Sequence, residues 1–185
     1  MVYKSSNNLI NHKFKKEAAG FTLVEILVVM SIIVTLSVIV LPSYRDGDRQ
    51  FALQRSANKL AQDIRRIEEM AISSVETGGE VPLGGYGVYF DISNPNQYIL
   101  FADFDGDHVY DEYGGEPIGN PVNFEANVKI DSLLPTSPLN ITFTSPDPTI
   151  SINNDPAIII STITIGNGSD SENIIVNKAG LIYVE

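Results

Sequence analysis

Residues 21–41 read FTLVEILVVMSIIVTLSVIVL, an apolar run in which Glu25 is the single charged residue. An α-helix rises about 1.5 Å per residue, so this run extends for about 31 Å, roughly the thickness of the hydrocarbon core of a membrane. The sequence therefore predicts a transmembrane and assembly helix over residues 21–42, with Pro42 at its end.

Residues 1–20 precede the apolar run, and their lysines are Lys4, Lys13, Lys15 and Lys16. Lysines beside a membrane helix stay on the cytoplasmic side, so residues 1–20 are predicted to be a cytoplasmic leader. An ordinary secretory signal would have a shorter apolar core, about 7–15 residues, followed by a small-x-small cleavage site. The sequence LPSYRDGD over residues 41–48 offers no such site. A simple membrane anchor without processing is the second alternative.

Pro42 removes a helix hydrogen bond and is predicted to kink the helix. Beyond it, apolar residues recur at spacings of three and four, which predicts an amphipathic continuation of the helix over residues 43–77. The apolar stripe consists of Leu53, Ala57, Leu60, Ile64, Ile67 and Ala71. We expect the stripe to pack on the domain that follows, and the helix to end between residues 73 and 77.

Residues 78–185 are predicted to form an acidic, β-rich globular domain. Short runs of aromatic and β-branched residues indicate strands. These runs cover residues 86–91, 97–102, 127–134, 139–144, 157–165, 173–177 and 181–184. The sequence Asn-Lys-Ala-Gly at residues 177–180 predicts a hairpin turn between the last two strands. The predicted fold class is α+β, with a long kinked N-terminal helix packed on an antiparallel β-sheet.

Charge is divided unevenly along the chain, whose formal net charge is −11. The chain up to Arg66 carries ten Lys/Arg and five Asp/Glu, whereas the rest carries two Lys and eighteen Asp/Glu. A basic start and a strongly acidic body indicate a membrane-associated beginning and a solvated domain. They argue against a general nucleic-acid surface, because phosphate binding requires clustered cations. The chain has no Cys, which excludes disulfides.

The segment Gly20-Phe21-Thr22-Leu23-Val24-Glu25, with the apolar run and Pro42 behind it, resembles the N-terminal motif of type IV pilins and type II secretion pseudopilins. The resemblance implies cleavage between Gly20 and Phe21 by the prepilin peptidase, followed by N-methylation of Phe21. Gly20 suits a cleavage site because a residue without a side chain lets the protease approach the backbone closely.

A looser likeness extends into the body of the chain. The sequences SANKLAQDIRRIEEMAIS (residues 56–73), GYGVYF (85–90), QYILFADFDGD (97–107) and NKAGLIYV (177–184) resemble the GspH/FimT-like minor pseudopilins. The resemblance implies a structural, minor subunit of a type IV pilus or a type II secretion pseudopilus. It implies as partners other pilin subunits, the prepilin peptidase and the inner-membrane assembly platform. It places the chain in the cell membrane by a single pass, with the C-terminal domain outside the cytoplasm.

Glu25 lies one helical turn from the N-terminus that cleavage at Phe21 would create. A lone carboxylate in hydrocarbon costs a few kcal/mol on insertion scales, so it requires a partner. In a filament of parallel helices, that partner is expected to be the α-amino group of a neighbour's Phe21, and the charge pair would fix the register between subunits. The alternative is a carboxylate at the membrane edge with no function.

Neither catalysis nor nucleic-acid binding is indicated. The two histidines are His12 in the leader and His108, and no phosphate-binding glycine motif is present. An enzyme would have to rely on His108 with Asp103 or Asp111 as an acid/base set. A pilus-tip adhesin or DNA-uptake subunit is the alternative function. Some FimT-like proteins bind DNA through basic residues near the C-terminus, but here that region offers Lys178 alone.

An acidic stretch follows the second predicted strand, with Asp103, Asp105, Asp107, Asp111 and Glu112 within ten residues. Ca²⁺ prefers six to eight oxygen ligands, which closely spaced Asp residues in a tight loop supply. The sequence predicts a calcium site with Asp103, Asp105, Asp107 and Asp111 as ligands and Glu112 in reserve. It is no EF-hand, because Gly114 stands at the twelfth position. A solvated acidic turn without an ion is the alternative.

Overall fold

The computed structural model describes residues 20–112, 114 and 116–185, apart from the side chains of residues 41–44 and 46. The predicted leader, residues 1–20, therefore lies outside the described part of the chain except for Gly20. The chain forms two compact units, Met1–Ser43 and Tyr44–Glu185, each described by itself below.

One helix, α1 (Leu23–Ile72), contributes to both units. Pro42 stands inside α1. Its side chain is among those not described, so the kink predicted there stays a prediction. The helix ends at Ile72, one residue before the predicted range, where Ser74 adopts a left-handed conformation with φ 45°. A left-handed residue at this place is a common way for a helix to stop.

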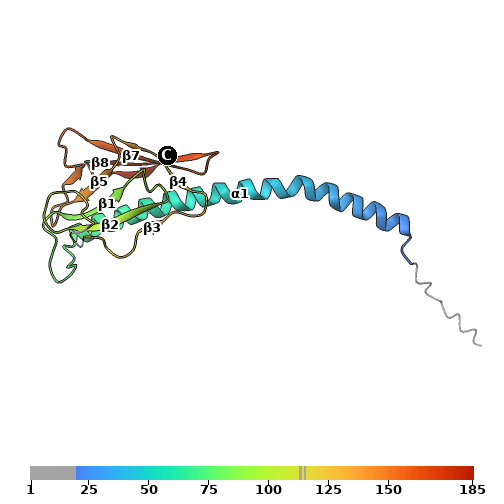
Figure 1. Cartoon of the computed structure of the whole chain (residues 1–185), viewed down its shortest axis with the longest axis horizontal. Coiled ribbons are helices and arrows are strands. Elements are labelled where there is room, and N and C mark those ends of the chain that lie inside the picture. The colour runs from blue at the N-terminus through green and yellow to red at the C-terminus, as the bar shows by residue number, and fades with distance from the viewer. Residues whose placement is uncertain (1–19, 113, 115) are drawn as a thin grey trace, which may run out of the picture. The chain divides into compact units, whose positions relative to one another are not determined.

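Nine strands follow the helix among the described residues of the second unit (Figure 1), and all of their pairings are antiparallel. Their bounds are β1 (Gly85–Phe90), β2 (Gln97–Asp103), β3 (Val122–Asn123), β4 (Lys129–Leu134), β5 (Leu139–Phe143), β6 (Ile150–Ile152), β7 (Ile160–Gly166), β8 (Ser171–Asn177) and β9 (Ile182–Val184). They form a five-stranded sheet in the order β3-β2-β1-β5-β6 and a four-stranded sheet in the order β4-β7-β8-β9.

The predicted α+β class is confirmed, with three differences in detail. The strands belong to two sheets, and the short edge strands β3 and β6 were not predicted. The strand expected from residue 157 begins at Ile160, because Asp155 accepts a hydrogen bond from the amide of Ala157 and holds a turn there. The predicted hairpin between the last two strands is present as β8 and β9.

The hydrophobic core joins the helix to both sheets. All six residues of the predicted apolar stripe are buried, and Leu60 and Ile64 are fully inaccessible to solvent. They pack in one cluster with buried residues of the strands, including Val88, Phe90, Ile141, Ile163, Ile174 and Val176. Figure 1 shows the strands gathered around the C-terminal part of α1. The amphipathic pattern therefore predicted the docked face correctly.

Polar contacts fix the helix against each sheet. The hydroxyl of Tyr98 on β2 donates to Asp63 Oδ2 at 2.5 Å. Arg65 donates to the carbonyl oxygen of Ile182 on β9 at 2.7 Å. Arg55 forms a two-pronged ion pair with Glu125, with Nη2 and Oε2 2.6 Å apart. These contacts give the docked helix one register against both sheets.

Candidate functional site

The N-terminal segment places the predicted cleavage site directly before the helix. α1 begins at Leu23, and the backbone N–H of Glu25 donates to Thr22 Oγ1 at 3.2 Å. A threonine at this position satisfies one of the free amides of the first turn. Thr22 and Glu25 also have the spacing of a capping box, and a carboxylate suits the positive end of the helix dipole. Sequence reasoning missed this local role of the pair.

The surface of this segment is open along its whole length. Every described residue from 20 to 40 is exposed, and Phe21 is 80% exposed. The stretch Leu23–Val40 has the length and composition of a membrane span, and none of it is buried. Apolar surface of this extent must be covered by lipid or by other chains. No described residue of the chain covers the segment, which leaves it available to lipid or to other chains.

Glu25 shares one face of the helix with apolar neighbours. Together they border a shallow hollow of about 250 Å³, lined by Phe21, Glu25, Ile26, Val29, Met30 and Ile33. Phe21 and Glu25 therefore lie on the same side of the segment. A neighbouring helix that packed against this side would meet both the carboxylate and the first residue of the mature chain.

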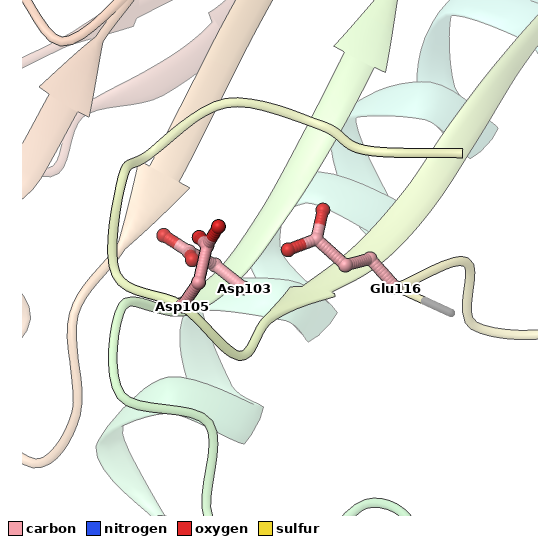
Figure 2. Close-up of side chains that lie close together, drawn as sticks. All are labelled: Asp103, Asp105 and Glu116. Atoms are coloured by element: carbon pink, nitrogen blue, oxygen red, sulfur yellow. The ribbon is translucent and has the colours of Figure 1, made fainter. Parts of the chain in front are cut away.

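The acidic turn after β2 is organised around Asp103 (Figure 2). Its side chain is fully buried and accepts backbone hydrogen bonds from Gly106 at 2.7 Å and His108 at 2.9 Å. Gly84 lies against it, because a Cβ added there would come within 1.8 Å of Asp103 Oδ2. Asp103 therefore holds the turn together, whatever else it binds.

Three carboxylates meet at this turn. One oxygen from each of Asp103, Asp105 and Glu116 lies within 4.8 Å of the others, and Figure 2 shows Glu116 approaching from the segment beyond the turn. The amide of Ala102 donates to the carbonyl oxygen of Glu116 at 2.8 Å, which attaches this segment to β2. Glu116 is 3% exposed. Its position results from pairing with β2, so spacing along the sequence did not reveal it.

The predicted ligand set and the observed cluster differ. Asp103 and Asp105 are in the cluster, and Glu116 joins them, whereas Asp107 and Asp111 are not part of it. Asp107 Oδ1 instead accepts the amide of Val109 at 2.8 Å. The backbone of Asp111 donates to Glu116 Oε2 at 2.6 Å. The reserve ligand Glu112 borders a groove on the sheet instead.

Burial raises the pKa of Asp103, and the hydrogen bonds from Gly106 and His108 oppose that effect. Burial also raises the pKa of Glu116, with the charges of Asp103 and Asp105 adding to it. Three crowded carboxylates favour a proton or a cation among them. His108 Nδ1 lies 3.3 Å from Asp103 Oδ2, so a protonated His108 is one source of positive charge and Ca²⁺ is another. Calcium would need further oxygens from the backbone or water, and its binding stays a prediction.

Comparison with known proteins identifies the N-terminal segment. Residues 15–41 match the family model of the prokaryotic N-terminal methylation motif. The match spans the predicted cleavage site, Phe21, Glu25 and the apolar run. It supports a type IV pilin-like subunit that is processed by prepilin peptidase, assembles with other pilin subunits and has a membrane-anchored N-terminus. No curated protein and no solved structure matched the chain.

Proposed function

We propose that the chain is a structural, minor subunit of a type IV pilus or a type II secretion pseudopilus. It is cut between Gly20 and Phe21, methylated on the amino group of Phe21, and assembled through its N-terminal helix. One observation carries this proposal: the methylation motif coincides with the helix segment Leu23–Val40, whose apolar surface no other part of the described chain covers. A filament core of packed helices would bury that surface after the subunit leaves the lipid.

Glu25 would act in assembly. It is exposed, lies on the same side of the segment as Phe21, and stands in an otherwise apolar stretch. A charge pair between this carboxylate and the α-amino group of a neighbour's Phe21 would be strong in a low-dielectric bundle. Because the pair would form in one axial position only, it would set the register of subunits.

The proposal involves no catalysis by this chain. The matched motif belongs to structural subunits, and His108 lies beside Asp103, whose carboxylate already accepts two backbone hydrogen bonds. A fully buried carboxylate engaged in this way supports the turn. The minor role rests on the likeness of residues 56–73 to GspH/FimT-like proteins.

The test is the mass of the mature protein extracted from membranes. We expect a chain that begins at Phe21 and carries one additional methyl group on its N-terminus. A mature chain that still begins at Met1, or that is cut after the apolar run, would overturn the proposal. Counting subunits in purified filaments then separates a minor from a major position.

A further inference from the structure

The turn between β7 and β8 contains the sequence Asn167-Gly168-Ser169. Asn-x-Ser and Asn-x-Thr, with any residue except proline in the middle, are the sequences to which N-linked glycans are attached in surface loops of extracytoplasmic domains. The chain contains a second such sequence, Asn140-Ile141-Thr142. The two sequences differ in how far a modifying enzyme can reach them.

The sequence at residues 140–142 is closed to modification. It belongs to β5, which lies between β1 and β6 in the five-stranded sheet. Asn140 is 4% exposed, and Thr142 is fully buried. The side-chain oxygen of Asn140 accepts the amide of Tyr110 at 3.0 Å, and its backbone amide donates to Asn153 Oδ1 at 2.6 Å. A sugar has no room at this position in the folded domain.

The turn at residues 167–169 is open and ordered. Gly168 and Ser169 are exposed, and Asn167 is half-buried. Asn167 Oδ1 accepts the amides of Ser169 at 2.9 Å and Asp170 at 2.8 Å, which makes an Asx turn. Gly168 supplies the left-handed φ of 89° at the tip. The turn therefore holds this glycan acceptor sequence on the surface in a defined conformation.

The nitrogen of the Asn167 side chain remains able to react. Asn167 Nδ2 donates to the carbonyl oxygen of Arg49 on α1 at 3.2 Å, the long end of the usual range for such a bond. A carboxamide nitrogen carries two hydrogens, so one is left over. Attachment of a sugar replaces one hydrogen only. The bond to Arg49 and the Asx turn can therefore both persist in the modified chain.

The contact with Arg49 also ties the turn to the membrane. Arg49 stands nine residues after Val40, the last residue of the apolar span. A chain extends at most about 3.6 Å per residue, so Arg49 lies within about 32 Å of the end of the span. Asn167 is bonded to Arg49 and shares this limit. A membrane-bound transferase can therefore reach the turn while the chain is anchored in lipid.

We propose that Asn167 is the attachment site of an N-linked glycan. The donor is a lipid-linked oligosaccharide diphosphate, and the catalyst is an oligosaccharyltransferase in the same membrane. Asn167 Nδ2 loses a proton and forms a bond to the anomeric carbon of the sugar. The bond from that carbon to the diphosphate oxygen breaks, and the lipid diphosphate leaves. This inference rests on the proposed function, because a filament subunit of this kind would expose its domain outside the cytoplasm.

The test is the mass of the full-length chain purified from the membranes of its own host. We expect a chain heavier than the processed, methylated protein by the mass of a sugar chain. Fragmentation of its peptides should place the added mass on Asn167 and leave Asn140 unmodified. Ser169→Ala should remove the added mass, because the acceptor sequence requires a hydroxyl at that position, and Ser169→Thr should retain it.

Thr142→Val is the matched control, because it destroys the other acceptor sequence. Thr142 Oγ1 is buried and forms no hydrogen bond within the described part of the chain, so valine fits in its place. The added mass should be unchanged in this variant. Thermal unfolding of each variant checks that the domain has folded. Loss of the added mass in a folded Thr142→Val domain, with retention in Ser169→Ala, would contradict the assignment to Asn167.

The outcomes separate this inference from the proposed function. An unmodified Asn167 in chains that were cut after Gly20 and entered filaments overturns the inference and leaves the proposed function standing. A sugar attached to a Ser or Thr hydroxyl instead has the same consequence. A glycan on Asn167 that depends on Ser169, in a chain that still begins at Met1 and never enters filaments, supports the inference and overturns the proposed function.

Discussion

The two halves of α1 differ in what covers their apolar residues. Between Leu23 and Val40 the apolar residues surround the helix and are all exposed. Between Leu53 and Ala71 they form one stripe, and the chain's own sheets bury it. One continuous helix thus contains a segment stabilised by the domain and a segment that must be stabilised by something outside the chain.

The difference follows from the spacing of apolar residues. A stripe at spacings of three and four leaves the opposite face polar, so one partner surface is sufficient. A run that is apolar all round requires an apolar environment on every side, first lipid and then neighbouring helices. Substitutions in the two halves should therefore affect different measurements. Those in the first half should change assembly, and those in the second should change the stability of the domain.

The largest effect is expected for Glu25→Ala. Removing one partner of a buried ion pair leaves the other charge unpaired and costs about 3–5 kcal/mol. Incorporation of the variant into filaments, measured against wild-type chains in the same cells, should fall about a hundredfold or more. Insertion into the membrane should be unchanged, because a charge has been removed from the apolar run.

Glu25→Gln is the control that separates two roles of this side chain. Glutamine preserves the capping-box spacing with Thr22 but carries no charge. If the charge pair matters, Glu25→Gln should fail to assemble as Glu25→Ala does. Assembly of Glu25→Gln at the wild-type level would show that Glu25 serves mainly to cap the helix.

A matched pair of truncations tests the second half of the helix. Ile64 is fully buried and Ile33 is 53% exposed. Ile64→Ala should lower the free energy of unfolding of the domain by about 2–5 kcal/mol, because it removes packed methyl groups and leaves a cavity. Ile33→Ala should leave it unchanged. Thermal unfolding of the purified protein measures both, and equal melting temperatures for Ile64→Ala and wild type would contradict the docked stripe.

The sequence predicted the helix best, because the helical pattern is local. The stripe, its docked face and seven of the strands were recognisable from periodicity and composition. The edge strands β3 and β6, with two and three residues, were not. Such short segments carry no periodic signal, and they are strands because neighbouring strands offer free hydrogen-bonding groups. The division into two sheets likewise depends on pairings between distant residues.

The candidate sites show the same limit. The motif around Glu25 was recognisable because its residues are contiguous. In the acidic turn, Asp103 and Asp105 were found by spacing, but Glu116 reaches them through a segment paired with β2.

Calcium should act on the domain and leave the membrane half unaffected. At a hundredfold excess over the dissociation constant, a bound ion would stabilise the folded domain by about 2.7 kcal/mol. Titration calorimetry, and melting with calcium or with chelator, measure this on a chain shortened to begin at Gly47. Glu116→Gln should abolish the response, and Asp107→Asn should retain it. The reverse pattern would favour the ligand set predicted from the sequence. If calcium does not change the unaltered domain, the acidic stretch is a solvated turn that binds no ion.

The smallest effect is expected where a single hydrogen bond joins the docked half of the helix to β2. Tyr98→Phe removes the bond to Asp63 at 2.5 Å and should cost about 1–2 kcal/mol at neutral pH.

Burial raises the pKa of Tyr98 above its ordinary value of 10.0, and the bond to Asp63 raises it further. The folded chain therefore binds more protons than the unfolded chain above pH 10, so the stability that Tyr98 contributes falls as the pH rises through that range. The difference in unfolding free energy between wild type and Tyr98→Phe should narrow above pH 10, as measured by denaturant unfolding at several pH values. A difference that stays constant or widens would show that the Tyr98 hydroxyl does not hold the helix to the sheet in this way.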